Sequence, residues 1–173
     1  MQNRTLALLD LSENYINDND CIPILRGLQK NRGLRVLNLE GNYIGETDKF
    51  NTELIAMLRA NSTLTHLCLA QNYVASTNRD AFVRQLANAL EKNVSLVYLS
   101  LWENYIREDD RRLLLDAQRT SNMTRAPLRR TNGVEKKSLL VLLLYGRRQS
   151  PFAKAINGNP QIVTRVVSYW GRT

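Results

Sequence analysis

His66 and Cys68 are the residues of this 173-residue chain whose types and spacing could support nucleophilic or acid–base chemistry. They stand two residues apart, so an extended backbone would direct both side chains to the same face. A histidine can serve as a general base near neutral pH, and a cysteine thiolate can act as a nucleophile. Because no Ser–Asp partner and no oxyanion site accompany them, we do not predict an enzyme.

The two cysteines, Cys21 and Cys68, lack a Cys or His neighbour at the spacing of metal ligands, so we expect neither zinc nor another cofactor. Two free thiols favour a reducing, cytoplasmic location. Residues 1–10 do not resemble a signal peptide, and the longest apolar run, Leu139–Tyr145, is far shorter than a membrane span. The same features are compatible with a pathogen effector delivered into a host cell.

Basic residues that could contact phosphates are concentrated at the end of the chain. Residues 1–120 hold 14 Lys and Arg against 15 Asp and Glu, whereas residues 121–173 hold 10 against one. The net charge of +8 therefore arises in the last 53 residues. This segment predicts nucleic-acid contact, docking onto an acidic partner, or simply solvated helix faces. The candidate contacts are Arg125, Arg129, Arg130, Lys136, Lys137, Arg147 and Arg148.

Four windows that begin at Asn3, Asn31, Asn61 and Asn93 align without gaps and reveal an internal repeat. A second asparagine recurs in step with them, at Asn14, Asn42, Asn72 and Asn104, so the repeat has a nearly constant length. Leucine fills three columns in every window: Leu6, Leu34, Leu64 and Leu96; Leu9, Leu37, Leu67 and Leu99; and Leu11, Leu39, Leu69 and Leu101.

The Leu-x-Leu alternation predicts a short strand with two leucines on one face. We expect the asparagine three residues later to bond the turning backbone of the next coil, as an asparagine ladder. Apolar residues at helical spacing predict helices over 22–31, 50–60, 81–92 and 112–120, with Pro23 in the first turn of its helix. One coil cannot bury its apolar face, but stacked coils can.

These repeats, over about residues 3–120, resemble the leucine-rich repeat superfamily, and their length resembles its ribonuclease-inhibitor-like subclass. The resemblance implies an α/β fold, a right-handed curved solenoid with parallel strands inside and helices outside. Proteins of this subclass mostly act as scaffolds, inhibitors, sensors or adaptors, and some activate small GTPases. The motif itself is almost silent on function.

The strand residues between the leucines form columns on the predicted concave face, where a protein partner would bind. Tyr98 and Trp102 cluster at the last coil as exposed aromatic anchors, beside acidic side chains that favour a basic partner. A C-terminal cap folded over them, or a solvated face, is the alternative. The predicted contacts are Asp10, Asn38, Glu40, His66, Tyr98, Trp102 and Glu103.

A fifth window at Asn122 places Arg125 and Arg130 in leucine columns, which predicts that the repeats end there. We therefore divide the chain into four repeats over residues 1–120 and a basic, helical C-terminal cap over 121–173. The cap is predicted as helices over 135–146, 151–158 and 160–170. The run Leu139–Tyr145 could instead be a buried strand.

Two further patterns belong to the repeat. Tyr15, Tyr43, Tyr73 and Tyr105 each follow a ladder asparagine and are expected to stack, either as packing between coils or as an aromatic rim for a ligand. The N-x-S/T sequons at Asn3, Asn61, Asn93 and Asn122 resemble glycosylation sites. We interpret them as repeat chemistry, because Asn31 holds the same column without a sequon.

The first strand, Leu6–Leu11, has only five residues before it and would leave backbone groups and apolar side chains uncovered. Self-association through this edge is a hypothesis.

Overall fold

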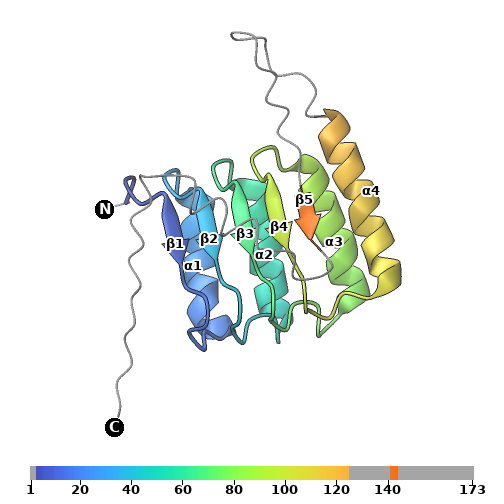
Figure 1. Cartoon of the computed structure of the whole chain (residues 1–173), viewed down its shortest axis with the longest axis horizontal. Helices are drawn as coiled ribbons and strands as arrows, with labels where there is room; N and C mark the ends of the chain where they lie inside the picture. Colours follow the sequence, from blue (N-terminus) through green and yellow to red (C-terminus); the bar gives the residue numbers. More distant parts are fainter. Residues whose placement is uncertain (1–2, 125–140, 144–173) are drawn as a thin grey trace.

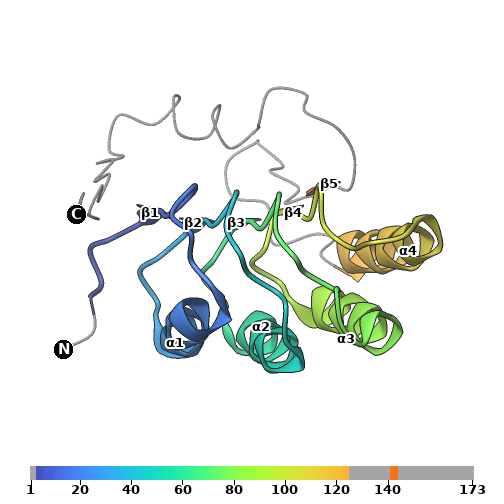
Figure 2. The same ribbon diagram turned by 90° about the horizontal axis from the view of Figure 1, so that it is seen from below.

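The computed structural model describes residues 3–124 and 141–143, which form two layers: one parallel sheet and helices packed against one of its faces (Figures 1 and 2). The strands lie in the order β1-β2-β3-β4-β5. The elements are β1 (Leu8–Asp10), α1 (Asp18–Lys30), β2 (Val36–Asn38), α2 (Asp48–Ala60), β3 (His66–Cys68), α3 (Arg79–Lys92), β4 (Tyr98–Ser100), α4 (Glu108–Thr124) and β5 (Val141–Leu143). The predicted α/β class is confirmed.

The strand register reproduces the columns of the sequence alignment. Leu9 pairs with Leu37, Leu37 with Leu67, and Leu67 with Leu99, and the flanking columns follow in step. This register places the repeated leucines on the helix side of the sheet. Each unit of strand, turn, helix and return therefore stacks on the next with identical positions in contact.

The core lies between the sheet and the helices. Leu37 and Leu67 from the strands and Phe50 and Leu86 from the helices are completely buried. Burying each such side chain contributes about 1.5–3 kcal/mol relative to leaving it in water. In the first coil, by contrast, Leu6 is 39% exposed, because no coil packs on its outer side in the described structure.

Helix α1 begins four residues earlier than the spacing of its apolar residues predicts. Asn17 caps it by accepting hydrogen bonds from the N–H groups of Asn19 (2.8 Å) and Asp20 (3.3 Å), while the Asp20 carboxylate accepts from the N–H of Asn17 (3.2 Å). This capping box is strong enough to set the start. The expectation that Pro23 lies in the first turn is therefore wrong, and Pro23 lies inside the helix.

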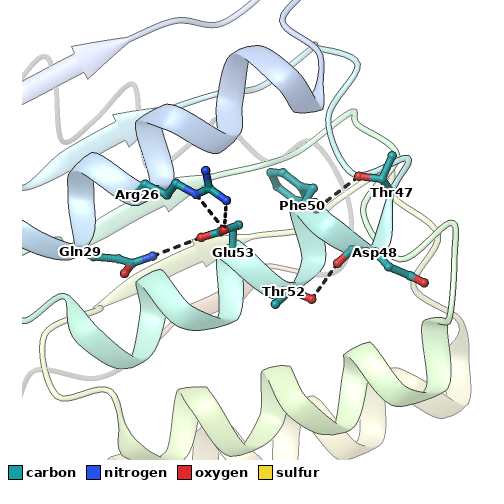
Figure 3. Close-up of polar contacts among 7 residues, drawn as sticks. All are labelled: Arg26, Gln29, Thr47, Asp48, Phe50, Thr52 and Glu53. Atoms are coloured by element: carbon teal, nitrogen blue, oxygen red, sulfur yellow. Dashed lines mark hydrogen bonds and ion pairs between the residues drawn. The ribbon is translucent and has the colours of Figure 1, made fainter.

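The helix layer is joined by polar contacts between neighbouring coils (Figure 3). Arg26 of α1 donates two hydrogen bonds to Oε1 of Glu53 on α2, at 2.8 and 2.6 Å, and Gln29 donates to Oε2 of the same residue at 3.3 Å. Thr47 caps α2 by accepting from the N–H of Phe50 at 3.3 Å. Because Arg26 is exposed, solvent screens its ion pair and the pair adds little to stability; the leucine core stabilises the layer more.

The asparagines that follow the strands form a ladder, but they bond the preceding coil rather than the next one. Asn72 donates to the carbonyl of Leu39 at 2.8 Å and accepts from the N–H of Ile44 at 3.1 Å, both one coil back. Asn104 repeats the pattern, with Leu69 as acceptor and Val74 as donor. The direction predicted from the sequence is therefore wrong. The side chain reaches backwards because the preceding turn presents the unpaired backbone groups.

A second asparagine ladder lies at the carboxyl ends of the helices. The amides of Asn61 and Asn93 donate to carbonyls of Leu28 and Leu58, one coil back, at 2.6 Å in both cases. Their oxygens accept N–H groups of the following turn, such as that of Leu64 at 2.7 Å. The spacing of these asparagines places them in the repeat, but it does not predict this ladder.

Strand β5 corrects the prediction of a helix over 135–146. Val141–Leu143 pairs in parallel with β4, with Val141 opposite Tyr98 and Leu143 opposite Ser100. The physical reason is that β4 would otherwise present an open edge of backbone N–H and C=O groups, which a strand satisfies and a helix cannot. Helix α4 also ends at Thr124 rather than at residue 120. Residues 125–140 and 144–173, which include the predicted cap helices, lie outside the described residues.

The ladder predicts unequal effects for two asparagines at equivalent repeat positions. Replacing buried Asn72 by Ala leaves the N–H of Ile44 without its acceptor and removes one of the donors to the carbonyls of Leu39 and Ala70, and we expect a loss of about 1–3 kcal/mol in the free energy of unfolding. Asn14 has no coil before it in the described structure, and its amide donates only to Ser12. Asn14→Ala should cost less than half as much. Urea unfolding followed by circular dichroism measures both, and equal losses would contradict the ladder.

Candidate functional site

The face of the sheet opposite the helices, here called the strand face, carries the seven residues predicted to contact a partner. Strand register and turns bring them together from all four repeats. Their exposure differs, however, and their role in binding stays a prediction. Asn38 and Tyr98 are buried, Asp10, Glu40, His66 and Trp102 are half-buried, and Glu103 is exposed.

Tyr98 is only 4% exposed, so the expectation of an exposed aromatic anchor is wrong at this position. Its ring stacks on that of His66, with the ring centres 5.8 Å apart and the planes 28° from parallel. The two residues are direct neighbours in the register of β3 and β4, which brings their rings into contact. Sequence alternation assigned the face correctly but could not give the packing on it.

A small apolar cluster lies on the strand face, separate from the main core. It consists of buried Cys68 and Ala70 with half-buried Val36 and Trp102 packed against them. Trp102 is thus packed on this cluster and is half-buried. A half-buried indole close to the end of a strand is the type of side chain that dominates protein interfaces.

His66 and Cys68 do not form a catalytic pair. The Cys68 thiol donates to Oε2 of Glu40 at 3.7 Å, and the Nδ1 of His66 lies 2.9 Å from the hydroxyl of Thr65. Burial, reinforced by the Glu40 carboxylate, raises the pKa of Cys68 to about 12, and burial lowers the pKa of His66. Near neutral pH the cysteine is therefore a thiol and the histidine is neutral, so this arrangement does not generate a nucleophile.

Several of the polar side chains are engaged in local turns. The Asp10 carboxylate accepts from the N–H (3.0 Å) and the hydroxyl (2.7 Å) of Ser12. Asn38 accepts from the N–H of Glu40 at 3.1 Å, and Glu103 accepts from the amide of Gln71 at 2.7 Å. Asp10 and Asn38 therefore help to end their strands, whereas Glu40 and Glu103 keep carboxylate oxygens available at the surface.

The four tyrosines stack along one edge, as predicted. The ring centres of Tyr15, Tyr43, Tyr73 and Tyr105 follow one another at 5.9, 6.0 and 6.1 Å, with planes within 24° of parallel. The last three of these tyrosines, together with the turn residues just before them, line an open groove of about 480 Å³. We call this the tyrosine groove; its residues are Gly41, Asn42, Tyr43, Gln71, Asn72, Tyr73, Glu103, Asn104 and Tyr105.

The residue before each ladder asparagine has a left-handed backbone. The φ angles are +57° at Glu13, +66° at Gly41, +54° at Gln71 and +50° at Glu103. Non-glycine residues adopt this conformation at a cost of roughly 1 kcal/mol. The repeated asparagine bonds hold the turn closed against that cost. The sequence showed only Gly41 as a signal for this turn, because its three counterparts are residues that rarely adopt positive φ.

The sequons are consistent with a role in the repeat. Asn61 and Asn93 are 4% and 6% exposed, and both side-chain groups of each are engaged in the second ladder. Glycosylating either amide would remove a buried hydrogen-bond donor. The Asn3 side chain is exposed and accepts from the N–H groups of Thr5 and Leu6. The side chain of Asn122 lies outside the described part of the chain.

All seven basic residues predicted to contact nucleic acid lie outside the described residues: Arg125, Arg129, Arg130, Lys136, Lys137, Arg147 and Arg148. Within residues 3–124 and 141–143, no three His, Cys, Asp or Glu side chains come together as metal ligands. None of the helices described in the structure has the length and apolar character needed to cross a bilayer.

Two solved structures show the fold. The chain matches a structure described as leiomodin-1 actin-binding site 2 with a TM-score of 0.54 and 20% identity, over 70% of this chain and 67% of that one. It matches a tropomodulin C-terminal domain from Caenorhabditis elegans with a TM-score of 0.50 and 17% identity, over 66% of each chain.

The fold is leucine-rich-repeat-like. The chain spans about two thirds of the length of each of these domains. No protein-family model matches the sequence, and no curated protein does. Sequence identities this low support the architecture alone.

The raised pKa of the thiols predicts that the folded chain resists thiol reagents. Cys21 and Cys68 are buried, and burial raises the pKa of each to about 12. At pH 8 only about one thiol in 10⁴ is then ionised, whereas a free cysteine is about one quarter ionised. Ellman's reagent should leave both thiols unmodified in native buffer and modify both in 6 M urea, roughly the range that unfolds small domains. Fast native modification would contradict the burial.

The single histidine predicts a pH dependence of stability. Burial lowers the pKa of His66, so the unfolded chain binds the proton more readily than the folded chain. The histidine's contribution is fully present above the unfolded pKa of about 6.5 and is lost as the pH falls from there towards the folded pKa. The urea midpoint should decrease between pH 7.5 and 5.5, about one unit either side of that value. His66→Gln should flatten this slope, and an unchanged slope would contradict the assignment.

Proposed function

We propose that this chain is a non-enzymatic interaction module that binds a protein partner on the strand face. The observation that carries the proposal is the apolar cluster on that face, in which Trp102 packs on Cys68 and Ala70 yet remains half-exposed. The adjacent carboxylates of Glu40 and Glu103 favour a partner with basic groups. The leiomodin-1 structure of similar fold is described as an actin-binding site, which supports a protein as the class of partner.

We further propose the finer features that the repeat implies. These are a right-handed curved solenoid of the ribonuclease-inhibitor-like subclass, with the strand face concave and a helical cap within residues 121–173. The division at residue 120, the scaffold or adaptor role and the cytoplasmic location belong to the same proposal. Their support is the nearly constant repeat length, which leaves room for a full helix in each coil, and the buried, unlinked thiols of Cys21 and Cys68.

A second candidate function is contact with nucleic acid through the basic segment. Its support is the concentration of 10 Lys and Arg against one acid in residues 121–173. Binding of this kind weakens steeply with salt, because each neutralised phosphate releases counterions. A protein complex centred on Trp102 would depend far less on salt, so the two functions are separable in one experiment.

Capture experiments with Trp102→Ala test the proposed strand-face site. Removing a half-buried indole at the centre of an interface typically weakens binding by about 30-fold, and we expect capture of the partner to be lost. Immobilised full-length chain would be exposed to cytosolic extract at about 50 and 300 mM salt, with mass-spectrometric identification, and separately to filamentous actin.

Val94→Ala is the matched control, because Val94 is 70% exposed and lies outside the strand face. It should leave capture unchanged, and both variants should melt within a few degrees of the parent chain. Equal capture by the parent chain and the Trp102 variant would refute the strand face as the binding surface. Loss of all capture at the higher salt would favour the basic segment instead.

A further inference from the structure

We propose that the tyrosine groove binds an extended, arginine-containing segment of a partner protein. The groove is lined by residues of the turns that follow β2, β3 and β4, and Figure 1 shows these turns at the arrowhead ends of the strands. It does not depend on Trp102, and of the residues proposed for the strand-face site it shares only Glu103. It accounts for the exposure of the tyrosine column, which packing between coils does not explain.

Packing between coils is already provided by a different column of the repeat. The residue after each tyrosine is Ile16, Ile44, Val74 or Ile106, and three of these, Ile44, Val74 and Ile106, are at most 7% exposed. Three of the tyrosines are far more accessible, with Tyr15 77% exposed, Tyr43 44% and Tyr105 54%, while Tyr73 is half-buried. Their stacking stabilises the edge modestly, but their rings and hydroxyls remain available to a ligand.

The chemistry of the groove favours a cation. Several of its backbone donors are used within the fold: the N–H groups of Gly41 and Gln71 bond the carbonyls of Ala70 and Trp102, and those of Tyr43, Tyr73 and Tyr105 bond carbonyls of the preceding coil. In the described residues no hydrogen bond involves the four tyrosine hydroxyls. The ladder asparagines are likewise engaged with backbone groups. What the groove offers is aromatic rings, hydroxyls and the carboxylate of Glu103.

The surrounding charges are mostly of one sign. The turns over residues 11–17, 39–47, 69–78 and 101–107 contain Glu13, Glu40, Glu46 and Glu103 against one basic residue, Arg107. A cation beside stacked phenol rings and these carboxylates gains both cation–π and ion-pair energy. Arginine fits better than lysine, because its planar guanidinium can lie against a ring while its N–H fork meets a carboxylate.

The dimensions of the ladder define the length of the ligand. Successive ring spacings of 6.0 and 6.1 Å place Tyr43 and Tyr105 about 12 Å apart, and Tyr15 extends the ladder by 5.9 Å. An extended chain rises about 3.3 Å per residue, so three to six residues cover the ladder. In such a chain every second side chain points to the same side, so alternate arginines would meet the groove together.

The test is fluorescence anisotropy with the full chain and a labelled Gly-Arg-Gly-Arg-Gly-Arg peptide at about 50 mM salt. Peptides with Lys or Glu in place of Arg are the controls. We expect the arginine peptide to bind, the lysine peptide to bind about threefold to fivefold more weakly, and the glutamate peptide not to bind. Equal binding of the arginine and lysine peptides, or no binding of either, would overturn the proposal.

Variants separate the groove from general attraction between charges. Tyr43→Leu combined with Tyr105→Leu, and separately Glu103→Gln, should each weaken binding of the arginine peptide about fivefold. The corresponding Tyr→Phe pair should retain most of it, because the rings remain. Glu91→Gln, an exposed change on α3, is the charge-matched control and should have no effect. Equal weakening by Glu91→Gln and Glu103→Gln would overturn the proposal.

Nuclear magnetic resonance of the unmodified chain tests the same site without a variant that could unfold. Amide shifts on peptide addition should concentrate at residues 41–43, 71–73 and 103–105. Shifts confined to other surfaces would refute the groove. Light scattering adds a further outcome, because a dimer that the paired Tyr→Leu variant dissociates would identify a second copy of this chain, rather than a basic segment, as the occupant.

Discussion

Each coil of this protein depends on its neighbouring coils for its hydrogen bonds and for the burial of its leucines. A three-residue strand followed by a tight turn leaves carbonyls and N–H groups that its own backbone cannot pair. The ladder amides of Asn42, Asn72 and Asn104 supply the missing partners from the next coil along the chain. A buried N–H or C=O group without a hydrogen-bond partner costs on the order of 1–3 kcal/mol. Neighbouring coils therefore stabilise each other, and the stack is cooperative.

Both candidate surfaces follow from that stacking. Parallel register places equivalent residues of successive coils side by side. The side chains of one column of the sequence alignment therefore form a row on the surface of the protein. One row brings His66 against Tyr98, another brings Cys68 and Ala70 under Trp102, and a third becomes the tyrosine stack. The left-handed turns at Gln71 and Glu103 line the tyrosine groove, and Glu103 also belongs to the strand face, so the two surfaces adjoin.

Some features of this fold could be predicted from the sequence, and others could not. The leucine columns and the tyrosine stack were predictable, because strict spacing in a parallel repeat translates directly into neighbours in space. The start of α1 was not, since the capping box at Asn17 outweighs the apolar spacing that suggested a later start. The burial of Tyr98 was not predictable either, because alternation along a strand assigns a face and says nothing of what packs on it.

By itself, the sequence determined the α/β class, the number of coils up to residue 120, the alignment of their columns and the charge asymmetry of the chain. These follow from periodicity and composition, which are local properties. Only the tertiary structure decided which way the asparagines bond, that Asn61 and Asn93 form a second ladder, and that Val141–Leu143 pairs with β4 as a strand. Each of these depends on which backbone groups a neighbouring coil leaves unpaired, and no pattern within one coil contains that information.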